Sequence, residues 1–591
     1  MAVEQWSITG ILITVLCLFI WGRWRYDVVA LMALFASTLL GIVPNDQLFS
    51  GFGHPATIMV AIVLILSYGL TKSGAIEGVV KLVSPLSAIP SLHITALLFI
   101  AAFFSMFMNN VGALALLMPI AIQSTVKAGR SPSTVLMPLS FGSILGGLVT
   151  LIGTPPNIII ATYRQQTFGE PFHMFDFAPV GGAIALAGIL FMSIVGWRLV
   201  KVRKTNAGSS LFEIESYLFE VKVPKDSDLK GKSTRELEGM LVDYDITLAA
   251  LIHKKQYHPV PAKRHLLATN DVLVLEGGQE EIDKLVSKYG LALLGADSTR
   301  QAISHSENTV MMEVVLAPGS PLEEKVMEQI RFKANYGVNL LAVSREGKAL
   351  RGRLKQLQLK VGDVLLLHGE QEHVEELVGK LGCFPLAERG VNFGKRKYAM
   401  PALGIFAVSI VLSASGILPI QTSLGIAAVL MVLLNIVPVR ELYNGIDLPV
   451  IVLLGAMIPV GGALESTGTT KIIADGLLNM AGDMPIIVIL TAILVITMTL
   501  SDILNNAATA ILMAPIGKTI AESAGVSPDP FLIAVAVGAS CAFLTPIGHQ
   551  NNALVMGPGA YRFGDYWRVG LPLEVIIVAV AIPLILIVWP L

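Results

Sequence analysis

The sequence predicts an α-helical polytopic membrane protein in which two hydrophobic blocks flank one polar block. Of its 591 residues, 54% are hydrophobic and only 14% are charged, whereas soluble domains carry about 25% charged residues. The polar block, residues 201–400, holds 56 of the Asp, Glu, Lys and Arg side chains. This composition argues against a wholly soluble enzyme. The net charge of −1 gives no reason to expect a nucleic-acid partner.

The first hydrophobic block, residues 1–200, is predicted to contain continuous apolar segments and two interrupted ones. The interruptions fall at Asn109-Asn110 and at GTPPN, residues 153–157. Polar amides and a Pro-Pro pair free backbone groups that hydrocarbon cannot satisfy, so these positions break a membrane helix. The segments are Ile8–Trp21, Val28–Val43, Pro55–Leu70, Leu92–Ile122 (interrupted), Pro138–Thr162 (broken) and Val180–Val200.

The second hydrophobic block, residues 398–591, repeats this plan. Asn109 matches Asn505 at an offset of 396, and Gly153 matches Gly548 at an offset of 395. If each segment with an Asn pair is a re-entrant hairpin, each copy has five spans, and this odd number places the copies in opposite orientations. Secondary transporters have such inverted repeats, with sites where broken helices meet. The segments are Pro401–Leu418, Leu424–Val439, Leu448–Leu464, Ile486–Ile516 (interrupted), Leu532–Met556 (broken) and Leu571–Trp589.

The polar block also contains an internal repeat. Asp271 matches Asp363 at an offset of 92 within the similar runs NDVLVLEGGQEEIDKLV and GDVLLLHGEQEHVEELV. Strand-like alternation followed by an amphipathic helix predicts two α+β modules, 217–294 and 309–386, joined by a polar linker over 295–308. Basic residues flank the block on both sides (Arg198, Lys201, Arg203, Lys204, Lys395, Arg396 and Lys397), so residues 201–397 are predicted to be cytoplasmic.

The four interruptions are the candidate binding elements. A broken helix exposes carbonyl oxygens, which suit a hard cation such as Na⁺, and amide donors at helix N-termini, which suit an anion. Ser105 and Ser501 lie four residues before Asn109 and Asn505, so each hydroxyl is predicted to point at a hairpin tip. The alternative is that each break is a structural kink capped by Asn. Four breaks in two symmetric pairs favour a binding site.

Several other chemistries lack their sequence signals. No Lys or Arg lies at any of the four breaks, so an anion would be held by amides, hydroxyls and a bound cation. The sequence contains no Walker A motif that would indicate ATP hydrolysis, and no GxGxxG motif that would indicate a dinucleotide fold. Cys17, Cys383 and Cys541 are far apart, which predicts neither a disulfide framework nor a cysteine zinc site.

GTPPN and the two Asn tips resemble motifs of the divalent anion/sodium symporter family, whose members transport sulfate or dicarboxylates. The inserts resemble paired TrkA-C (RCK C-terminal) modules. Family members have Ser-Asn-Thr at both tips, whereas here the tips are Asn-Asn-Val (109–111) and Asn-Asn-Ala (505–507). The resemblance implies one Na⁺ site per half, formed by Ser105, Asn110 and Gly153 and by Ser501, Asn506 and Gly548. It also implies an anion site near Asn109, Asn110, Thr154, Asn505, Asn506 and His549.

The function implied by this resemblance is sodium-coupled symport of a divalent anion by alternating access, in a homodimer in the cell membrane. The lost tip hydroxyls and the run TPIGHQNN, residues 545–552, favour sulfate. The alternatives are a dicarboxylate carrier and a transporter or channel for another oxyanion or bicarbonate on the same scaffold. TrkA-C modules often bind small regulatory ligands, although stabilising a dimer is an equally good explanation. The polar block contains no recognisable pair of nucleophile and base that would indicate an enzyme.

Overall fold

The computed structural model divides into two compact units. Residues Met1–Arg203 and Asn392–Leu591 form a helical unit, and Lys204–Val391 form a second unit. The structure describes residues 3–21, 23–73, 89–202, 218–242, 246–253, 256–258, 265–276, 279–293, 309–317, 320–330, 332–345, 348–350, 357–386, 398–482 and 484–591. The predicted linker over 295–308 and the basic residues 203–204 and 395–397 lie outside the described residues.

The first half of the helical unit follows the predicted apolar segments closely. Helices end where the interruptions were predicted: α5 ends at Ser105 and α6 begins at Asn110, while α8 begins at Pro155. The helices are α1 (Val3–Trp21), α2 (Tyr26–Leu39), α3 (Pro55–Lys72), α5 (Pro90–Ser105), α6 (Asn110–Lys127), α7 (Ser133–Gly147), α8 (Pro155–Phe168), α9 (Ala178–Phe191) and α10 (Trp197–Leu199).

The second half repeats this order of elements, and it contains a further described helix whose equivalent stretch in the first half lies outside the described residues. Helix α20 (Thr469–Ala481) lies in a stretch where no segment was predicted. The other helices are α17 (Ala399–Ala414), α18 (Ile420–Leu433), α19 (Leu448–Ser466), α21 (Ile486–Ser501), α22 (Asn506–Ser523), α23 (Asp529–Ser540), α24 (Gln550–Met556) and α25 (Trp567–Val588).

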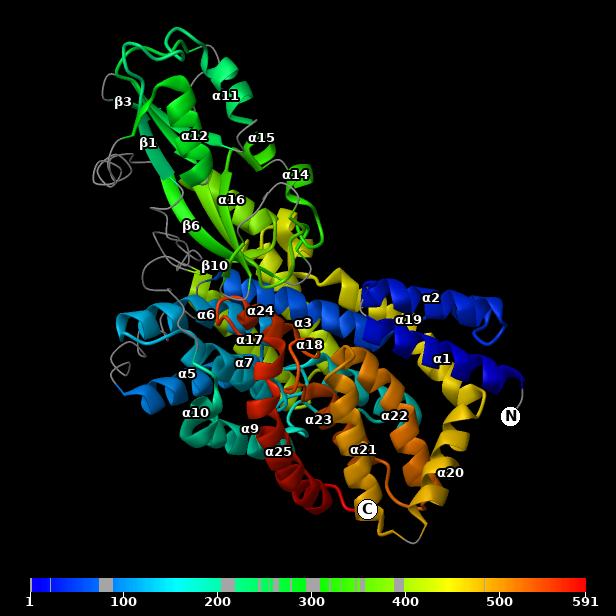
Figure 1. Ribbon diagram of the computed structural model, residues 1–591. Coiled ribbons are helices and arrows are strands. Elements are labelled where there is room, and N and C mark those ends of the chain that lie inside the picture. The colour runs from blue at the N-terminus through cyan, green and yellow to red at the C-terminus, as the bar shows by residue number, and fades with distance from the viewer. Residues whose placement is uncertain are drawn as a thin grey trace. The chain divides into compact units, whose positions relative to one another are not determined.

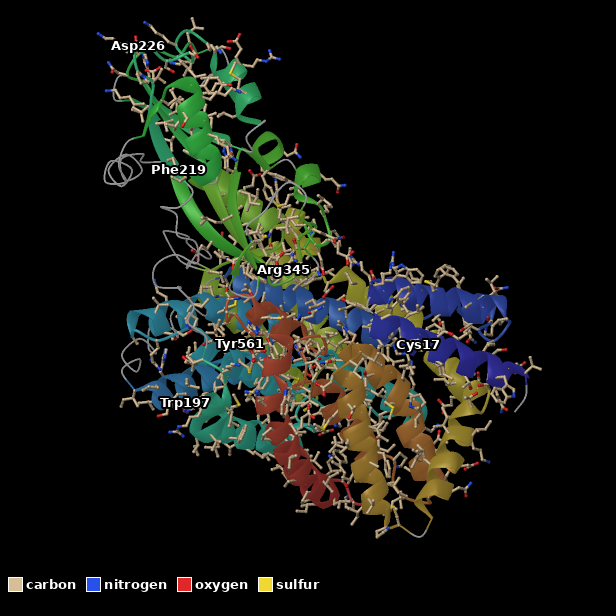
Figure 2. All side chains as sticks on the ribbon, viewed as in Figure 1. Cys17, Trp197, Phe219, Asp226, Arg345 and Tyr561 are labelled. Atoms are coloured by element: carbon tan, nitrogen blue, oxygen red, sulfur yellow. The ribbon has the colours of Figure 1, made fainter. Side chains whose placement is uncertain are left out.

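Within the described residues, five helices are long and apolar enough to cross a membrane: α1, α3, the continuous stretch Ala178–Leu199, α19 and α25. Eight further helices in this part of the chain are apolar but shorter. The two halves are packed against each other, with α9 beside α25 (Figure 1). Helix α8 contacts both α22 and α23. Tyr561, labelled in Figure 2, links them because its hydroxyl donates to the carbonyl of Ser133, at 2.6 Å, and accepts from the Met137 amide. The helical unit is therefore one packed body built from both ends of the chain.

The second unit consists of two α+β modules with the same topology. Their antiparallel sheets have the strand orders β3-β2-β4-β1-β5 and β8-β7-β9-β6-β10. The strands are β1 (Leu218–Lys222), β2 (Thr247–His253), β3 (Gln256–His258), β4 (Val272–Glu276), β5 (Ala292–Leu293), β6 (Thr309–Leu316), β7 (Asn339–Arg345), β8 (Lys348–Ala349), β9 (Val364–Glu370) and β10 (Cys383–Pro385). The helices are α11 (Thr234–Val242), α12 (Gln279–Tyr289), α14 (Met327–Ile330), α15 (Phe332–Tyr336) and α16 (Gln371–Lys380).

Each module has its own apolar core between sheet and helices. In the first module Val221, Leu273 and Ile282 are fully buried, and in the second Val314 and Leu365 hold the matching places. The amphipathic helices α12 and α16 do not end the modules, because β5 and β10 follow them and pair with β1 and β6. Burial raises the pKa of the Cys383 thiol, on β10, to about 12, so this cysteine stays protonated at neutral pH.

Candidate substrate and cation site

The first hairpin tip joins α5 to α6 and is held by two serines. The Ser105 hydroxyl donates to Asn110 Oδ1 at 2.6 Å, and the Ser143 hydroxyl of α7 donates to the Asn110 carbonyl at 2.8 Å. Ser105, Ser143 and Asn110 are all at least 97% buried. Asn109 caps α6 instead, with its Oδ1 accepting from the Val111 amide. The serine before the tip therefore contacts the second asparagine, and the first is used as a helix cap.

The first broken helix lies directly against this tip. A Cβ placed on Gly147, at the end of α7, would be 2.5 Å from Asn110 Oδ1, and one on Gly153 would be 2.5 Å from the Gly147 carbonyl. Only glycine permits both approaches. Thr154 is the N-cap of α8 and is 1% exposed, and its hydroxyl has no hydrogen-bond partner among the described residues. A buried hydroxyl without a partner is costly, which makes Thr154 available to a ligand.

The second half builds the same arrangement from side chains of the same types. Ser501 Oγ lies 2.9 Å from Asn506 Oδ1, and Asn505 caps α22 by accepting from the Ala507 amide. A Cβ on Gly548 would be 2.6 Å from the Ser501 carbonyl. In both halves, therefore, a serine, the second asparagine and a glycine of the broken segment bring oxygen atoms close together.

The two halves meet at Asn110. Its side-chain nitrogen lies 3.2 Å from His549 Nε2, and its carbonyl accepts from the Asn551 amide group at 3.2 Å. His549 is the N-cap of α24, where its Nδ1 accepts from the Asn551 backbone amide. His549 and Asn551 are at least 92% buried. The hairpin tip of the first half and the broken helix of the second thus form one buried polar network inside an apolar unit.

Two acidic side chains face each other behind the second tip. Asp502 is 2% exposed, and its Oδ1 accepts from the Leu544 amide at 2.9 Å. The carboxyl group of Glu574 on α25, which is also buried, interacts electrostatically with that of Asp502. One oxygen of each carboxyl group, Asp502 Oδ2 and Glu574 Oε1, receives no donor from a described residue. Buried acids of this kind favour a cation or a proton nearby.

The structure thus sorts the predicted site residues into four groups. Ser105, Asn110, Gly153 and His549 lie in the network of the first tip, while Ser501, Asn506 and Gly548 form the second cluster. Asn109 and Asn505 act as helix caps through one side-chain oxygen each. Thr154 lies beside the first cluster, and its hydroxyl has no hydrogen-bond partner within the described part of the chain.

A family model described as citrate transporter matches residues 16–538, most of the chain. The chain belongs to the citrate transporter family. A protein of this family is a transporter and not an enzyme, and its apolar helices make it a multi-pass membrane protein.

Relatives of this citrate transporter family member include full-length and partial matches. An uncharacterized transporter of Synechocystis is 30% identical over 98% of this chain and 95% of its own length. A putative sulfur deprivation response regulator of Chlamydomonas reinhardtii is 29% identical over 93% of this chain and 96% of its own length. Sodium/sulfate cotransporter 2 of the same alga is 25% identical over 60% of this chain and 42% of its own length.

In this family member, a cavity of about 810 Å³ lies beside α8 and α22, two helices that begin at predicted interruptions. Ile159 and Tyr163 of α8 and Ile511 and Lys518 of α22 line it, together with Glu465 of α19. Tyr163 donates to Glu465 at 3.3 Å, and Lys518 pairs with the same carboxylate. Charge at the four breaks did not predict this group, because Tyr163, Glu465 and Lys518 all lie outside the interruptions.

An ion pair fastens α8 to α23 beside this cavity. Arg164 donates to both carboxylate oxygens of Asp529, at 2.8 and 3.0 Å, and its guanidinium lies over Phe172. Removing the carboxylate leaves a partly buried guanidinium without its fork partner, so Asp529→Asn is expected to lower the free energy of unfolding by about 1–3 kcal/mol. Thermal unfolding of the purified transporter measures this. An unchanged melting temperature would mean that the pair is too well solvated to contribute.

Proposed function

We propose that the protein is a sodium-coupled symporter of a divalent anion, with sulfate as the favoured substrate. The observation that carries the proposal is the buried network in which Asn110 of one half meets His549 and Asn551 of the other. A site shared between two halves can open to one side or the other when the halves move. The printed names of the Chlamydomonas sodium/sulfate cotransporters support the choice of ions.

Sodium would bind once in each half. In the first half, Ser105 Oγ and Asn110 Oδ1 already lie 2.6 Å apart beside the glycine carbonyls of the broken segment, and a bound ion would draw both oxygens toward itself. In the second half, the oxygens of Ser501 and Asn506 and the backbone at Gly548 would do the same. Hydroxyl, amide and carbonyl oxygens are the ligands that hard cations prefer. The buried Asp502 would add negative charge to the second site.

The anion would lie between the tips. The most suitable donors are the imidazole of His549 and the hydroxyl of Thr154, which no described residue partners. The N-termini of α6, α8 and α22 add positive dipole ends. The amide nitrogens of Asn109, Asn110, Asn505 and Asn506 complete the set. At an inside-negative potential, each inward positive charge gains about 2.3 kcal/mol per 100 mV. A dianion therefore requires more than two Na⁺, or an added H⁺, to be driven electrically.

The proposed architecture consists of two membrane repeats and two cytoplasmic modules. Residues 1–200 and 398–591 would be inverted repeats of five spans, assembled as a homodimer in the cell membrane. Residues 217–294 and 309–386 would be cytoplasmic TrkA-C-like modules that regulate transport, with or without a small ligand. Their matching strand orders support a duplication of one module.

Uptake of labelled sulfate into proteoliposomes tests this function. With an inward Na⁺ gradient, sulfate is expected to accumulate and unlabelled succinate or citrate to leave the rate unchanged, while an equal K⁺ gradient serves as the control. The description of the family as citrate transporters favours the second candidate, a carboxylate carrier. Succinate or citrate uptake without sulfate flux would establish that candidate and overturn sulfate.

A further inference from the structure

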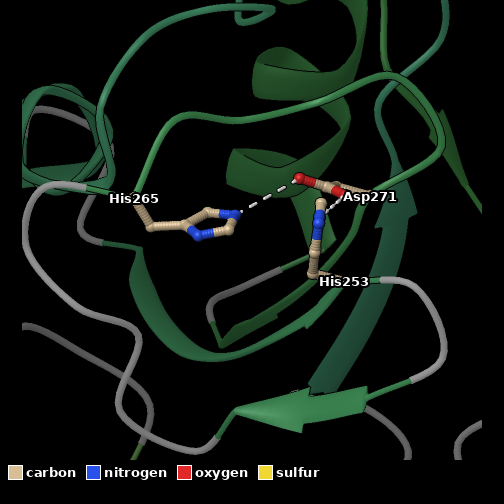
Figure 3. Close-up of side chains that lie close together, drawn as sticks. All are labelled: His253, His265 and Asp271. Atoms are coloured by element: carbon tan, nitrogen blue, oxygen red, sulfur yellow. Dashed lines mark hydrogen bonds and ion pairs between the residues drawn. The ribbon is translucent and has the colours of Figure 1, made fainter.

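Three metal-ligating side chains converge in the first α+β module (Figure 3). His253 ends β2, Asp271 immediately precedes β4, and His265 lies in the segment between these strands. His253 Nδ1 lies 2.7 Å from Asp271 Oδ1, and His265 Nε2 lies 3.8 Å from Asp271 Oδ2. Both imidazoles therefore point at one carboxylate, with one ring on each of its oxygens.

The second module holds its equivalent aspartate with different side chains. Its Asp363 occupies the place of Asp271, and in both modules Oδ2 accepts a backbone amide three residues earlier at 2.8 Å. Arg345, at the place of His253, donates to both oxygens of Asp363 at 2.7 Å. Leu357 stands where the first module has His265. One arginine is thus enough to neutralise and hold this buried aspartate.

In the first module, more imidazole nitrogens lie near Asp271 than its hydrogen bonds use. A hydrogen bond from His253 already partners Asp271 Oδ1. His265 Nε2 is buried and has no hydrogen-bond partner in the part of the chain that the structure describes. If that nitrogen carries a lone pair, it faces a carboxylate oxygen, which is repulsive unless a cation lies between them. Among the residues that the structure describes, no guanidinium takes the place beside Asp271 that Arg345 has beside Asp363.

We propose that His253, His265 and Asp271 form a binding site for a divalent transition metal of the Zn²⁺ class. Their ligand atoms lie within 4.8 Å of one another, and zinc bonds to histidine nitrogen and carboxylate oxygen are about 2.0–2.2 Å long, so side-chain movements of about 1 Å close the site. Two histidines and one carboxylate leave a fourth position for water. The site is independent of the transported anion, because it lies wholly within one module.

Metal counting on the purified, tag-free full-length protein in detergent tests the site. After removal of metals with a chelator and addition of Zn²⁺, the wild type is expected to retain one ion at this site. With Co²⁺ as a probe, the visible absorption bands of a tetrahedral ion are expected. His253→Arg and His265→Leu install the residues of the second module, so both proteins are expected to fold. Each is expected to lose this ion, with affinity at least about 100-fold lower.

The matched control is His373→Ala, which removes an exposed histidine of the second module and is expected to keep the full zinc content. Melting temperatures measured in chelator show whether each variant is folded. Added Zn²⁺ is expected to raise the melting temperature of the wild type and to leave those of the two site variants unchanged. Wild-type protein without a bound ion would overturn the proposal. So would equal zinc binding by a folded His253→Arg or His265→Leu variant.

Discussion

Asn110→Ala is expected to abolish anion uptake while the protein still reaches the membrane. Asn110 joins Ser105 of its own hairpin to His549 of the other half, and its loss removes the amide from the proposed sodium and anion sites together. A lost direct ligand is expected to reduce the initial rate at least about 100-fold. The measurement is sulfate uptake per amount of reconstituted protein. Wild-type uptake by this variant would remove the hairpin tip from the mechanism.

A pair of serine variants provides the matched control. Ser105 and Ser409 are both at least 97% buried in apolar helices, but Ser105 bonds to Asn110 whereas Ser409 bonds to the Phe406 carbonyl of its own helix at 2.7 Å. Ser105→Ala is expected to raise the Na⁺ concentration needed for half-maximal uptake, and Ser409→Ala to leave it unchanged. Equal effects of the two changes would indicate a general packing defect instead of a lost cation ligand.

Gly153→Ala and Gly548→Ala are expected to have the second large effect, the loss of sodium-stimulated uptake. The added methyl groups would lie 2.5 Å from the Gly147 carbonyl and 2.6 Å from the Ser501 carbonyl, distances at which backbone must move. Overpacking of this kind costs about 1–3 kcal/mol. Because the displaced carbonyls belong to the proposed cation sites, transport is expected to fail even where the protein remains folded.

The matched control for these glycines is Gly404→Ala in α17, where an added methyl group meets nothing within 4 Å. This variant is expected to transport normally and to be slightly more stable, because alanine favours helix over glycine. Uptake and melting temperature are measured together for all three variants. Normal sodium dependence in Gly153→Ala and Gly548→Ala would exclude the glycine backbone as part of the cation sites.

Much of the helical unit could be predicted because apolar runs and their interruptions are local features. Asn109-Asn110 and GTPPN correctly marked where α5, α6 and α8 begin and end. The prediction missed α20, which is amphipathic and carries weaker hydropathy than a span. It also missed β5 and β10, because strands of two or three residues have too few side chains for an alternating pattern.

The two asparagines of each pair have different roles, and these roles depend on backbone geometry that residue spacing in the sequence does not reveal. Ser105 is one helical turn before Asn109, yet it donates to Asn110. The helix ends at Ser105, so the turn that follows no longer has helical periodicity, and Asn109 satisfies the free amides of α6. The same physical reason applies to Ser501 and Asn506.

The sequence by itself determined that two related apolar blocks exist, where each is interrupted, and which polar residues lie at the breaks. Only the tertiary structure decided which breaks meet. Asn110 and His549 are 439 positions apart, and their contact depends on how two whole halves pack. In the same way, three residues spread from His253 to Asp271 became a cluster only when the strands of one sheet paired. Local patterns encode helix and strand, but contacts between distant side chains arise from packing.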